Sequence, residues 1–419
     1  MRIYLFCLFA FALLVSKPVL AQNDSLGPEI YTRSVLGIKA RPFIEYQSMI
    51  SAESGTLPTS LLWQLRTATT YDQALKDEIF ASLDGGLRLG ALQNNEIRFA
   101  YKGHRNRYLK PFAKESIALF HRGQTSLAAS EDLVKLILNG NKATAGIEQD
   151  LSDFAYEDWL YTGLQFQFGF LIDTLPVSIG TSLILGHYYQ SANSANTTLF
   201  TAENGSEINF AGSYNYNSVS RPAYLGIAGV GLAIDIETEE RWGKHQFNFK
   251  VQDLGFISFS DGASLEVDSS FSFRGINVSN IFTLQESVFQ ASLDSTTGVL
   301  GDPAGGDFTR LMPFMLQLEY EYHLAYGSLK SLYLQGRYRY LKRYLPRVEV
   351  GARWQIRKNK QLTTALNMGG FNSWGLSTEF DWQIKKYWQL GIGVSHVNTM
   401  VVQSIAGGSS AFFSLRYYL

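Results

Sequence analysis

The segment from residue 313 to residue 356 reads PFMLQLEYEYHLAYGSLKSLYLQGRYRYLKRYLPRVEVGARWQI. Between residues 314 and 324 every second residue is apolar, and from residue 317 on the positions between them hold Gln317, Glu319, Glu321 and His323. Two later runs, at 332–340 and 348–356, alternate in the same way. Successive side chains of a strand point to opposite faces, so each run predicts a strand with one apolar face and one charged face.

These two faces indicate a membrane rather than a water-soluble sheet. Soluble sheets seldom place so much Tyr, Trp and Leu on one face and a ladder of Arg and Glu on the other. A transmembrane barrel does so because lipid lies outside and a wet lumen inside. The predicted fold is all-β: a closed antiparallel transmembrane β-barrel of about 14 strands (roughly 12–18), with short helices in the N-terminal region and loops.

The start of the chain predicts export. Arg2 precedes an apolar run at 5–15, and Ala21 closes an acceptable cleavage site, so residues 1–21 predict a signal peptide. A membrane anchor is the alternative, but the apolar run is too short and Lys17-Pro18 interrupts it. Cys7 is the only cysteine, so the mature chain has no disulfide or thiolate site. No later stretch holds 18 apolar residues, so an exported membrane protein of this sequence must be a barrel, and the bacterial outer membrane is the expected location.

Further strands are predicted along most of the chain. A strand at 60–67 and a pair at 87–92 and 96–102, joined by a turn at 93–95, lie in the N-terminal region with a helix at 71–83. A strand at 117–122 and a helix at 130–138 follow. Beyond residue 155, strands are expected near 156–171, 177–190, 205–216, 223–236, 246–259, 264–275, 313–325, 330–341, 347–357, 361–370, 373–385, 387–397 and 410–419.

The connections between these strands alternate in length. Short ones, such as 172–176, 260–263 and 358–360, alternate with others that include long polar segments at 191–204, 276–312 and 398–409. Outer-membrane barrels have short periplasmic turns and long outer loops, so the alternation supports the barrel. The expected organisation is a signal peptide (1–21), N-terminal strands with a lumenal hatch as an alternative (22–110), and the barrel (111–419). The last strand ends on Leu419 after an aromatic pair, which resembles the signal read by the insertion machinery.

Several runs resemble one family. They are LNGNKA (138–143), GVGLAIDI (229–236), QDLGFISFS (252–260), FRGINVSNIF (273–282) and RYLPRVEVGARWQI (343–356). The chain resembles an uncharacterised Bacteroidota family of outer-membrane barrels, a domain of unknown function. That family is distantly similar to FadL-type fatty-acid transporters and to the FadL-like accessory barrel of the type IX secretion system. The resemblance implies about fourteen strands and an N-terminal hatch, but FadL-like hatches carry Asn-Pro-Ala, whereas the nearby proline here stands in Lys39-Ala40-Arg41-Pro42.

Motifs for catalysis or cofactors are not found in the sequence. The six histidines are scattered, and neither a His-Glu-x-x-His nor a Gly-x-Ser-x-Gly motif occurs. The run from Asp302 to Asp307 has the composition of a calcium loop without its spacing. The net charge of −1, with no basic block, argues against nucleic acid as a partner. We therefore expect no enzyme, no metal site and no cofactor.

The predicted lumenal ladder is the strongest constellation. Its six candidate site residues are Glu319, Glu321 and His323 on one strand, Arg337 and Arg339 on the next, and Arg353 on the third. Arg347, Glu349 and Arg357 lie on the same face of that third strand. One interpretation is a set of cross-strand charge pairs that wets the lumen and fixes register. The other is an arginine-rich site that binds an anionic head group by bidentate hydrogen bonds. Both remain open from the sequence.

Two functions are consistent with these features. The first is an outer-membrane barrel that passes or binds a small amphipathic or hydrophobic molecule, like a FadL-type porin or transporter. The alternative is a non-transporting accessory barrel of a secretion or outer-membrane assembly complex. The expected partners are outer-membrane lipid, the insertion machinery, and either a small amphipathic ligand or a secretion-complex protein.

Overall fold

The computed structural model describes residues 42–67, 72–83, 85–102, 114–172, 175–219, 226–273, 304–402 and 405–419. All of them belong to one of two compact units, Ser34–Leu419. The predicted signal peptide, the first part (22–41) of the N-terminal region for which a lumenal hatch was the alternative, and most of the predicted loop at 276–312 lie outside the described residues. In the described part, no helix is long and apolar enough to cross a membrane.

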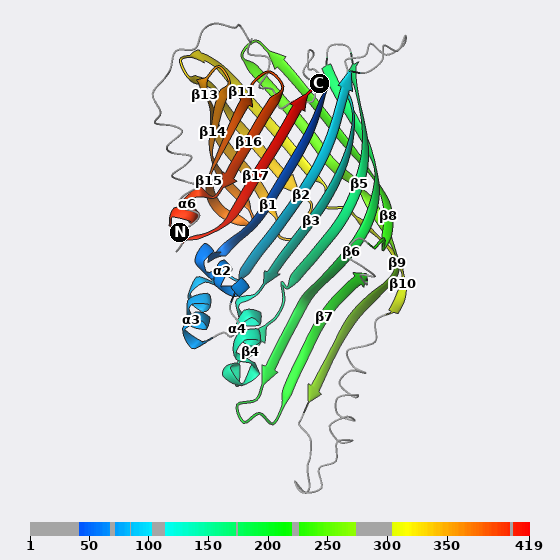
Figure 1. Ribbon diagram of the computed structural model, residues 1–419. Coiled ribbons are helices and arrows are strands. Elements are labelled where there is room, and N and C mark those ends of the chain that lie inside the picture. The colour runs from blue at the N-terminus through cyan, green and yellow to red at the C-terminus, as the bar shows by residue number, and fades with distance from the viewer. Residues whose placement is uncertain are drawn as a thin grey trace. The chain divides into compact units, whose positions relative to one another are not determined.

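Fourteen antiparallel strands close a barrel within the described part of the chain (Figure 1). Around the ring they are β1 (Phe43–Pro58), β2 (Leu87–Lys102), β3 (Lys114–Ala129), β5 (Ala155–Ile172), β6 (Leu175–Thr201), β8 (Gly229–Trp242), β9 (His245–Phe273), β11 (Met315–Tyr326), β12 (Leu329–Arg339), β13 (Leu345–Arg357), β14 (Lys360–Gly370), β15 (Asn372–Ile384), β16 (Trp388–Ser395) and β17 (Ala406–Tyr418). The ring closes because β1 pairs with β17 on one side and β2 on the other. The predicted closed antiparallel barrel is confirmed.

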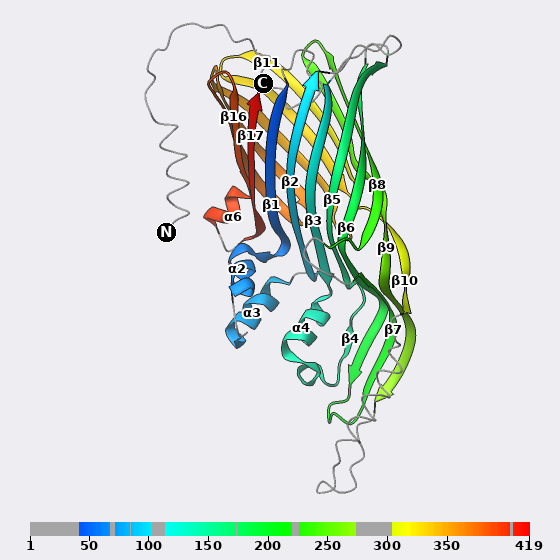
Figure 2. The same ribbon diagram turned by 45° about the vertical axis from the view of Figure 1, so that its right-hand side comes forward.

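Three further strands extend one part of the wall: β4 (Glu148–Asp150), β7 (Ile208–Val219) and β10 (Ala304–Leu311). The extension is built on two very long strands, β6 with 27 residues and β9 with 29. Along one half, both strands pair with β8, and where β8 ends, β7 takes its place between them. Figure 2 shows β4 and β7 continuing past the end of the ring.

The two ends of the barrel differ. One end is called here the short-turn end. Tight turns at this end join β8 to β9, β11 to β12 and β13 to β14. The last residue of the chain, Leu419, also lies there and donates a hydrogen bond to Pro42 (2.8 Å). The other end, called here the helical end, carries the extension, the helices α2 (Thr59–Thr67), α3 (Gln73–Ser82), α4 (Glu131–Asn139) and α6 (Val397–Val401), and the 3-10 helix η2 (Asn141–Thr144). This asymmetry agrees with the alternation of connection lengths in the sequence.

Several predicted boundaries are wrong. Residues 60–67 form α2 rather than a strand, because Leu57 and Leu61 pack with Ile79 of α3 and Val134 of α4. The predicted turn at 93–95 is part of β2, whose residues pair with β1 and β3 without interruption. The turn at 260–263 is a bulge within β9, with Asp261 at a φ of 53°, at the level where β7 replaces β8.

The predicted outer loops are also shorter than expected. Residues 191–201 continue β6, and β10 lies within the segment assigned to the loop at 276–312. The ring has about as many strands as predicted, but they are not the same strands. The ring includes β1 and β2, counts the predicted strands at 246–259 and 264–275 as one, and excludes β7.

The alternation along each strand sets the two faces of the wall. On β11, Leu318 is 56% exposed while its neighbour Glu319 is 7% exposed. The same inversion holds on β12, where Leu332 and Leu334 are exposed and Ser331 and Gln335 are buried. A soluble protein buries its large apolar side chains and exposes its charges. The described barrel has an apolar outer face and a polar, packed interior, which confirms the predicted faces of β11.

Candidate functional site: the lumen

A network of charges fills the middle of the lumen. Arg122 of β3, with 4% of its side chain exposed, contacts the carboxylate of Asp253 on β9 and lies 3.4 Å from Glu96 on β2. Glu96 also pairs with Arg98 at 2.7 Å. Each of these residues is buried or largely buried and alternates along its strand with more exposed, outward-facing neighbours, so it faces the lumen. The network therefore offsets the cost of burying its charges by pairing them.

The network continues across the barrel to β12. Arg339 Nη1 donates to Gln124 Oε1 (2.9 Å), and Gln124 Nε2 donates to the hydroxyl of Tyr161 (2.7 Å). The Tyr161 hydroxyl donates to Asp253 Oδ2 (3.3 Å). These bonds link β12 to β3, β5 and β9. The lumen is therefore bridged by side chains at this level.

An aromatic layer lies between this network and the helical end. Trp159 of β5 and Tyr189 of β6 have ring centroids 4.4 Å apart, and Tyr189 stacks on Phe259 of β9 at 5.5 Å. The same apolar cluster includes Leu341 and Tyr344 from the connection between β12 and β13, which thus turns inward over the lumen. The interior changes from charged to aromatic toward the helical end.

Four of the six predicted ladder residues form one cluster. Arg353 Nη2 lies 2.9 Å from Glu319, and its Nη1 contacts Glu321. Gln335 Nε2 donates to the second oxygen of Glu319 (2.7 Å). His323 Nδ1 lies 3.7 Å from Glu321. In this cluster the two carboxylates share one guanidinium, so they are already satisfied within the protein.

Arg337 and Arg339 lie outside that cluster. Arg337 Nη2 donates to Gln335 Oε1 (2.9 Å), and Arg339 bonds to Gln124 as above. Among the residues that the structure describes, neither guanidinium has a carboxylate oxygen within 4.0 Å, and neither Nε has a hydrogen-bond partner. The charge pairing that the sequence suggests for Arg337 and Arg339 is instead made by Arg353. Within the described residues, two successive lumen-facing arginines of β12 therefore have no carboxylate in direct contact.

A second polar cluster lies at the helical end. His396, between β16 and α6, is fully buried, and its Nε2 lies 3.9 Å from Glu53 Oε1. Glu53 is held by Arg347 Nη1 at 3.2 Å. Burial lowers the pKa of His396 below its usual range, and Arg347 acts in the same direction while Glu53 opposes them. Within the described ranges, no group of three or more His, Cys, Asp or Glu side chains could hold a metal ion.

Sequence reasoning missed the central network. A turn was expected at 93–95, which separated Glu96 and Arg98 from the rest of β2. Arg122 and Asp253 stand 131 residues apart, and no local pattern joins them. The available signal was the spacing of Phe120, Arg122 and Gln124, which alternate with outward-facing residues on β3.

Comparisons with known proteins identify a family but assign no substrate. Residues 62–388 match the family described as "Family of unknown function (DUF5723)". A comparison with curated proteins finds no match.

Solved structures with some similarity include three channels or transporters. The Ralstonia pickettii toluene transporter TbuX shares 9% identity, with 91% of this chain and 90% of that chain covered and a TM-score of 0.44. The Pseudomonas putida toluene transporter TodX shares 8%, with 90% of each chain covered and a TM-score of 0.44. A Pseudomonas aeruginosa FadL homologue shares 7%, with 90% of each chain covered and a TM-score of 0.45. Since the family match spans more than three quarters of the sequence, the chain belongs to the DUF5723 family.

Proposed function

We propose that this protein is an outer-membrane β-barrel that binds, and passes, a small anionic amphipathic molecule. The apolar outer face and the closed ring support a membrane location, since lipid satisfies no free backbone group at an open sheet edge. The predicted signal peptide and the aromatic C-terminal strand support the outer membrane. Diffusion along a lumen needs neither a cofactor nor an energy source.

The observation that carries this proposal is that, among the described residues, no carboxylate lies within 4.0 Å of Arg337 or Arg339. Glu319 and Glu321 of the ladder are paired with Arg353 instead. Burying a cation is costly unless an anion accompanies it. A carboxylate head group supplies that anion and matches the planar donors of a guanidinium.

The surroundings of Arg339 suit the rest of an amphipathic ligand. Leu341 and Tyr344, which follow on the chain, belong to the aromatic layer, and Tyr161 connects that layer to the Arg339 network. An anionic head at the arginines places an alkyl chain along these aromatic side chains. The expected ligand class is therefore a carboxylate with an apolar tail.

The test compares two probes of equal chain length, dodecanoate and dodecanol. Purified wild-type protein is expected to bind dodecanoate about 10- to 100-fold more tightly, because hydrogen bonds to a charged group contribute roughly 1.5–3 kcal/mol. Arg337→Gln combined with Arg339→Gln should abolish this preference and leave a folded, heat-modifiable barrel. Arg357→Gln, at an exposed position of β13, is the matched control. Equal binding of both probes by the wild-type protein would contradict the proposal.

The accessory-barrel alternative also has one structural feature in its favour. β10 pairs with β9 on one edge, and in the described part of the chain its other edge has no strand partner. An exposed edge can accept a strand from another protein. A stoichiometric large partner in a pull-down from detergent-solubilised membranes would favour this alternative, and a barrel isolated alone would favour the ligand proposal.

A further inference from the structure

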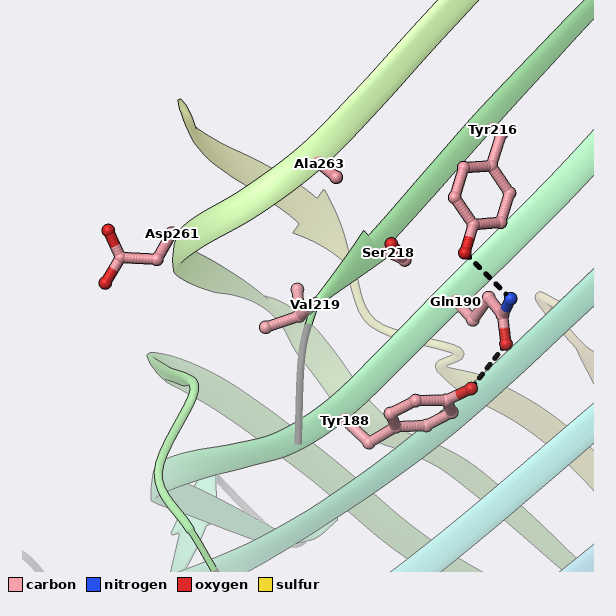
Figure 3. A pocket seen from close by; sticks show the side chains of 7 residues that line it. All are labelled: Tyr188, Gln190, Tyr216, Ser218, Val219, Asp261 and Ala263. Atoms are coloured by element: carbon pink, nitrogen blue, oxygen red, sulfur yellow. Dashed lines mark hydrogen bonds between the residues drawn. The ribbon is translucent and has the colours of Figure 1, made fainter. Parts of the chain in front are cut away.

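A cavity of about 420 Å³ opens on the outer face of the wall, where β6, β7 and β9 meet (Figure 3). In the register of these strands, Gln190 lies beside Ser218, and Ser218 beside Ala263, and all three line the cavity. The adjacent Asn217 is buried on the lumenal face, where it accepts a hydrogen bond from Arg310 (2.7 Å). Val219 also lines the cavity and belongs to the apolar cluster that contains the aromatic layer, so the inner wall of the cavity adjoins that layer. None of the described lining residues is an arginine of the lumen.

The cavity lies just beyond the edge of the apolar outer belt. Along β6 toward the helical end, the outward-facing residues change from the exposed Leu183 and Leu185 to Tyr188 and Gln190. Tyrosine is enriched where the acyl region of a membrane meets the head groups. The position along the strand therefore corresponds to the head-group level of the lipid leaflet at the helical end.

Polar side chains also appear on the outer face of the neighbouring strands, at the level of Leu185, because Thr162 pairs with Leu185 on one side and with His121 on the other. Leu119 is followed on β3 by His121, and Leu164 is preceded on β5 by Thr162. Thr162 Oγ1 lies 3.0 Å from His121 Nδ1 and 2.8 Å from His187 Nε2 of β6, at hydrogen-bond distance from both. These polar side chains lie just on the short-turn side of Tyr188, which itself pairs with Leu160 of β5.

The lining has the chemistry of a sugar site. Tyr188 donates to Gln190 Oε1, and Gln190 Nε2 donates to the Tyr216 hydroxyl (3.0 Å), which fixes the three side chains in a row (Figure 3). Within the described part of the chain, the second amide hydrogen of Gln190 and the hydroxyls of Tyr216 and Ser218 donate to no hydrogen-bond acceptor, and Asp261 presents an exposed carboxylate. Sugar hydroxyls both donate and accept, so they match such a mixed set.

The charge of the described lining residues favours a neutral head group over a phosphate. Asp261 is the charged residue among the described residues that line the cavity, and neither Lys nor Arg is one of them. A phosphate beside a carboxylate without a basic partner is electrostatically unfavourable, whereas an uncharged sugar is not. Tyr188 and Tyr216 also offer ring surface to the apolar side of a sugar ring.

We propose that this cavity binds the neutral sugar head group of a glycolipid whose acyl chains lie along the apolar belt beneath it. The proposal rests on the outer-membrane location in the proposed function and not on the lumenal anion site. Failure of dodecanoate binding leaves it unaffected.

The experiment uses nanodiscs that contain equal amounts of diglucosyldiacylglycerol and phosphatidylcholine. Native mass spectrometry of the released protein measures which lipid it retains. The wild-type protein is expected to retain about ten times more glycolipid than phosphatidylcholine, because one or two net hydrogen bonds to the sugar give a preference of this size. Tyr216→Phe, which removes one oxygen, and Gln190→Met are each expected to lower that ratio about fivefold.

Tyr338→Phe is the matched control, because Tyr338 also faces outward but lies on β12, away from the cavity. It should leave the ratio unchanged. Equal retention of both lipids by the wild-type protein, or a ratio that Tyr216→Phe does not alter, would overturn the proposal. If Gln190→Met fails to give a heat-modifiable barrel, Tyr216→Phe alone decides the outcome.

Discussion

Lumenal arginines that contact a carboxylate and those that do not should contribute differently to the free energy of unfolding. Arg353 neutralises both Glu319 and Glu321. Arg353→Gln should therefore lower the free energy of unfolding by about 3–5 kcal/mol, since it leaves buried carboxylates unpaired. Urea unfolding of the protein in lipid vesicles measures the change.

Two further variants separate charge pairing from general damage. Adding Glu319→Gln and Glu321→Gln to Arg353→Gln should restore much of the stability, because no unpaired charge then remains. Arg337→Gln, which has no carboxylate partner among the described residues, should cost much less than Arg353→Gln. Equal costs for Arg337→Gln and Arg353→Gln would refute the assignment of the charge pairs.

The buried His396 at the helical end should make the stability of the folded protein depend on pH. Burial lowers the pKa of His396 in the folded protein, with Arg347 adding to the effect and Glu53 opposing it. A lowered folded-state pKa means that the unfolded chain binds more protons below about pH 6.5. This contribution to stability is complete above the unfolded pKa and is lost as the pH falls through the folded pKa.

The expected result is a lower midpoint of heat modification for the wild-type protein at pH 5 than at pH 8. His396→Asn should reduce that difference, because Asn does not titrate and tolerates the left-handed φ of 64° at this position. An unchanged difference in His396→Asn would show that other groups cause the pH dependence.

At the scale of the element, β11 offers a test of the two faces. Leu318→Arg puts a charge on the outer face and should cost roughly 2–4 kcal/mol if it lies near the bilayer midplane. Gln317→Glu is the control, since Gln317 faces the lumen and pairs across the strands with Arg337 and Lys250. The control should assemble normally, as measured by heat-modifiable migration. Equal impairment by both variants would mean that the faces are assigned incorrectly.

The sequence predicted the strands from β11 to β15 well and those nearer the N-terminus less well. The predicted strand at 313–325 corresponds to Met315–Tyr326, because its alternation is unbroken and its turns are short. Asn94 and Asn95 were expected to form a turn. In the barrel they accept hydrogen bonds from Arg122 (2.9 Å) and Ser48 (2.8 Å). Their role depends on neighbouring strands, which local propensity does not encode.

The candidate site was also predicted only in part from the sequence. Alternation on three consecutive strands predicted that Glu319, Glu321 and Arg353 share the interior wall, and the structure brings them together. Which arginine neutralises the two glutamates depends on register across β12, where Gln335 lies opposite Glu319. The contact between Arg122 and Asp253 depends on closure of the whole ring, which no local pattern reports.

At the scale of the whole molecule, side chains bridge the lumen of the described barrel at two levels. The network from Arg339 to Asp253 crosses the lumen, and the aromatic layer packs on its helical-end side. The wild-type protein in planar bilayers should therefore show no large steady conductance. Trp159→Ala combined with Phe259→Ala should increase conductance, because it removes two fully buried rings from the layer. A wide, stable pore in the wild-type protein would contradict this description.

Closure of the ring is the central structural claim, and one cross-link tests it. Ser51 of β1 lies opposite Ser410 of β17, although the two residues are far apart in the sequence. Directly paired positions in an antiparallel sheet are close enough for a disulfide. Because Cys7 in the predicted signal peptide is the only native cysteine, introduced cysteines report without interference.

The measurement is oxidation of Ser51→Cys/Ser410→Cys in isolated outer membranes, followed by boiling and non-reducing electrophoresis. The closed barrel predicts an internal disulfide that makes the boiled chain migrate faster, and reduction should reverse the change. Ser51→Cys/Ser331→Cys is the control, because Ser331 faces the lumen from β12 and is not paired with β1. Failure of the first pair to cross-link, or equal cross-linking of both pairs, would contradict the closed barrel.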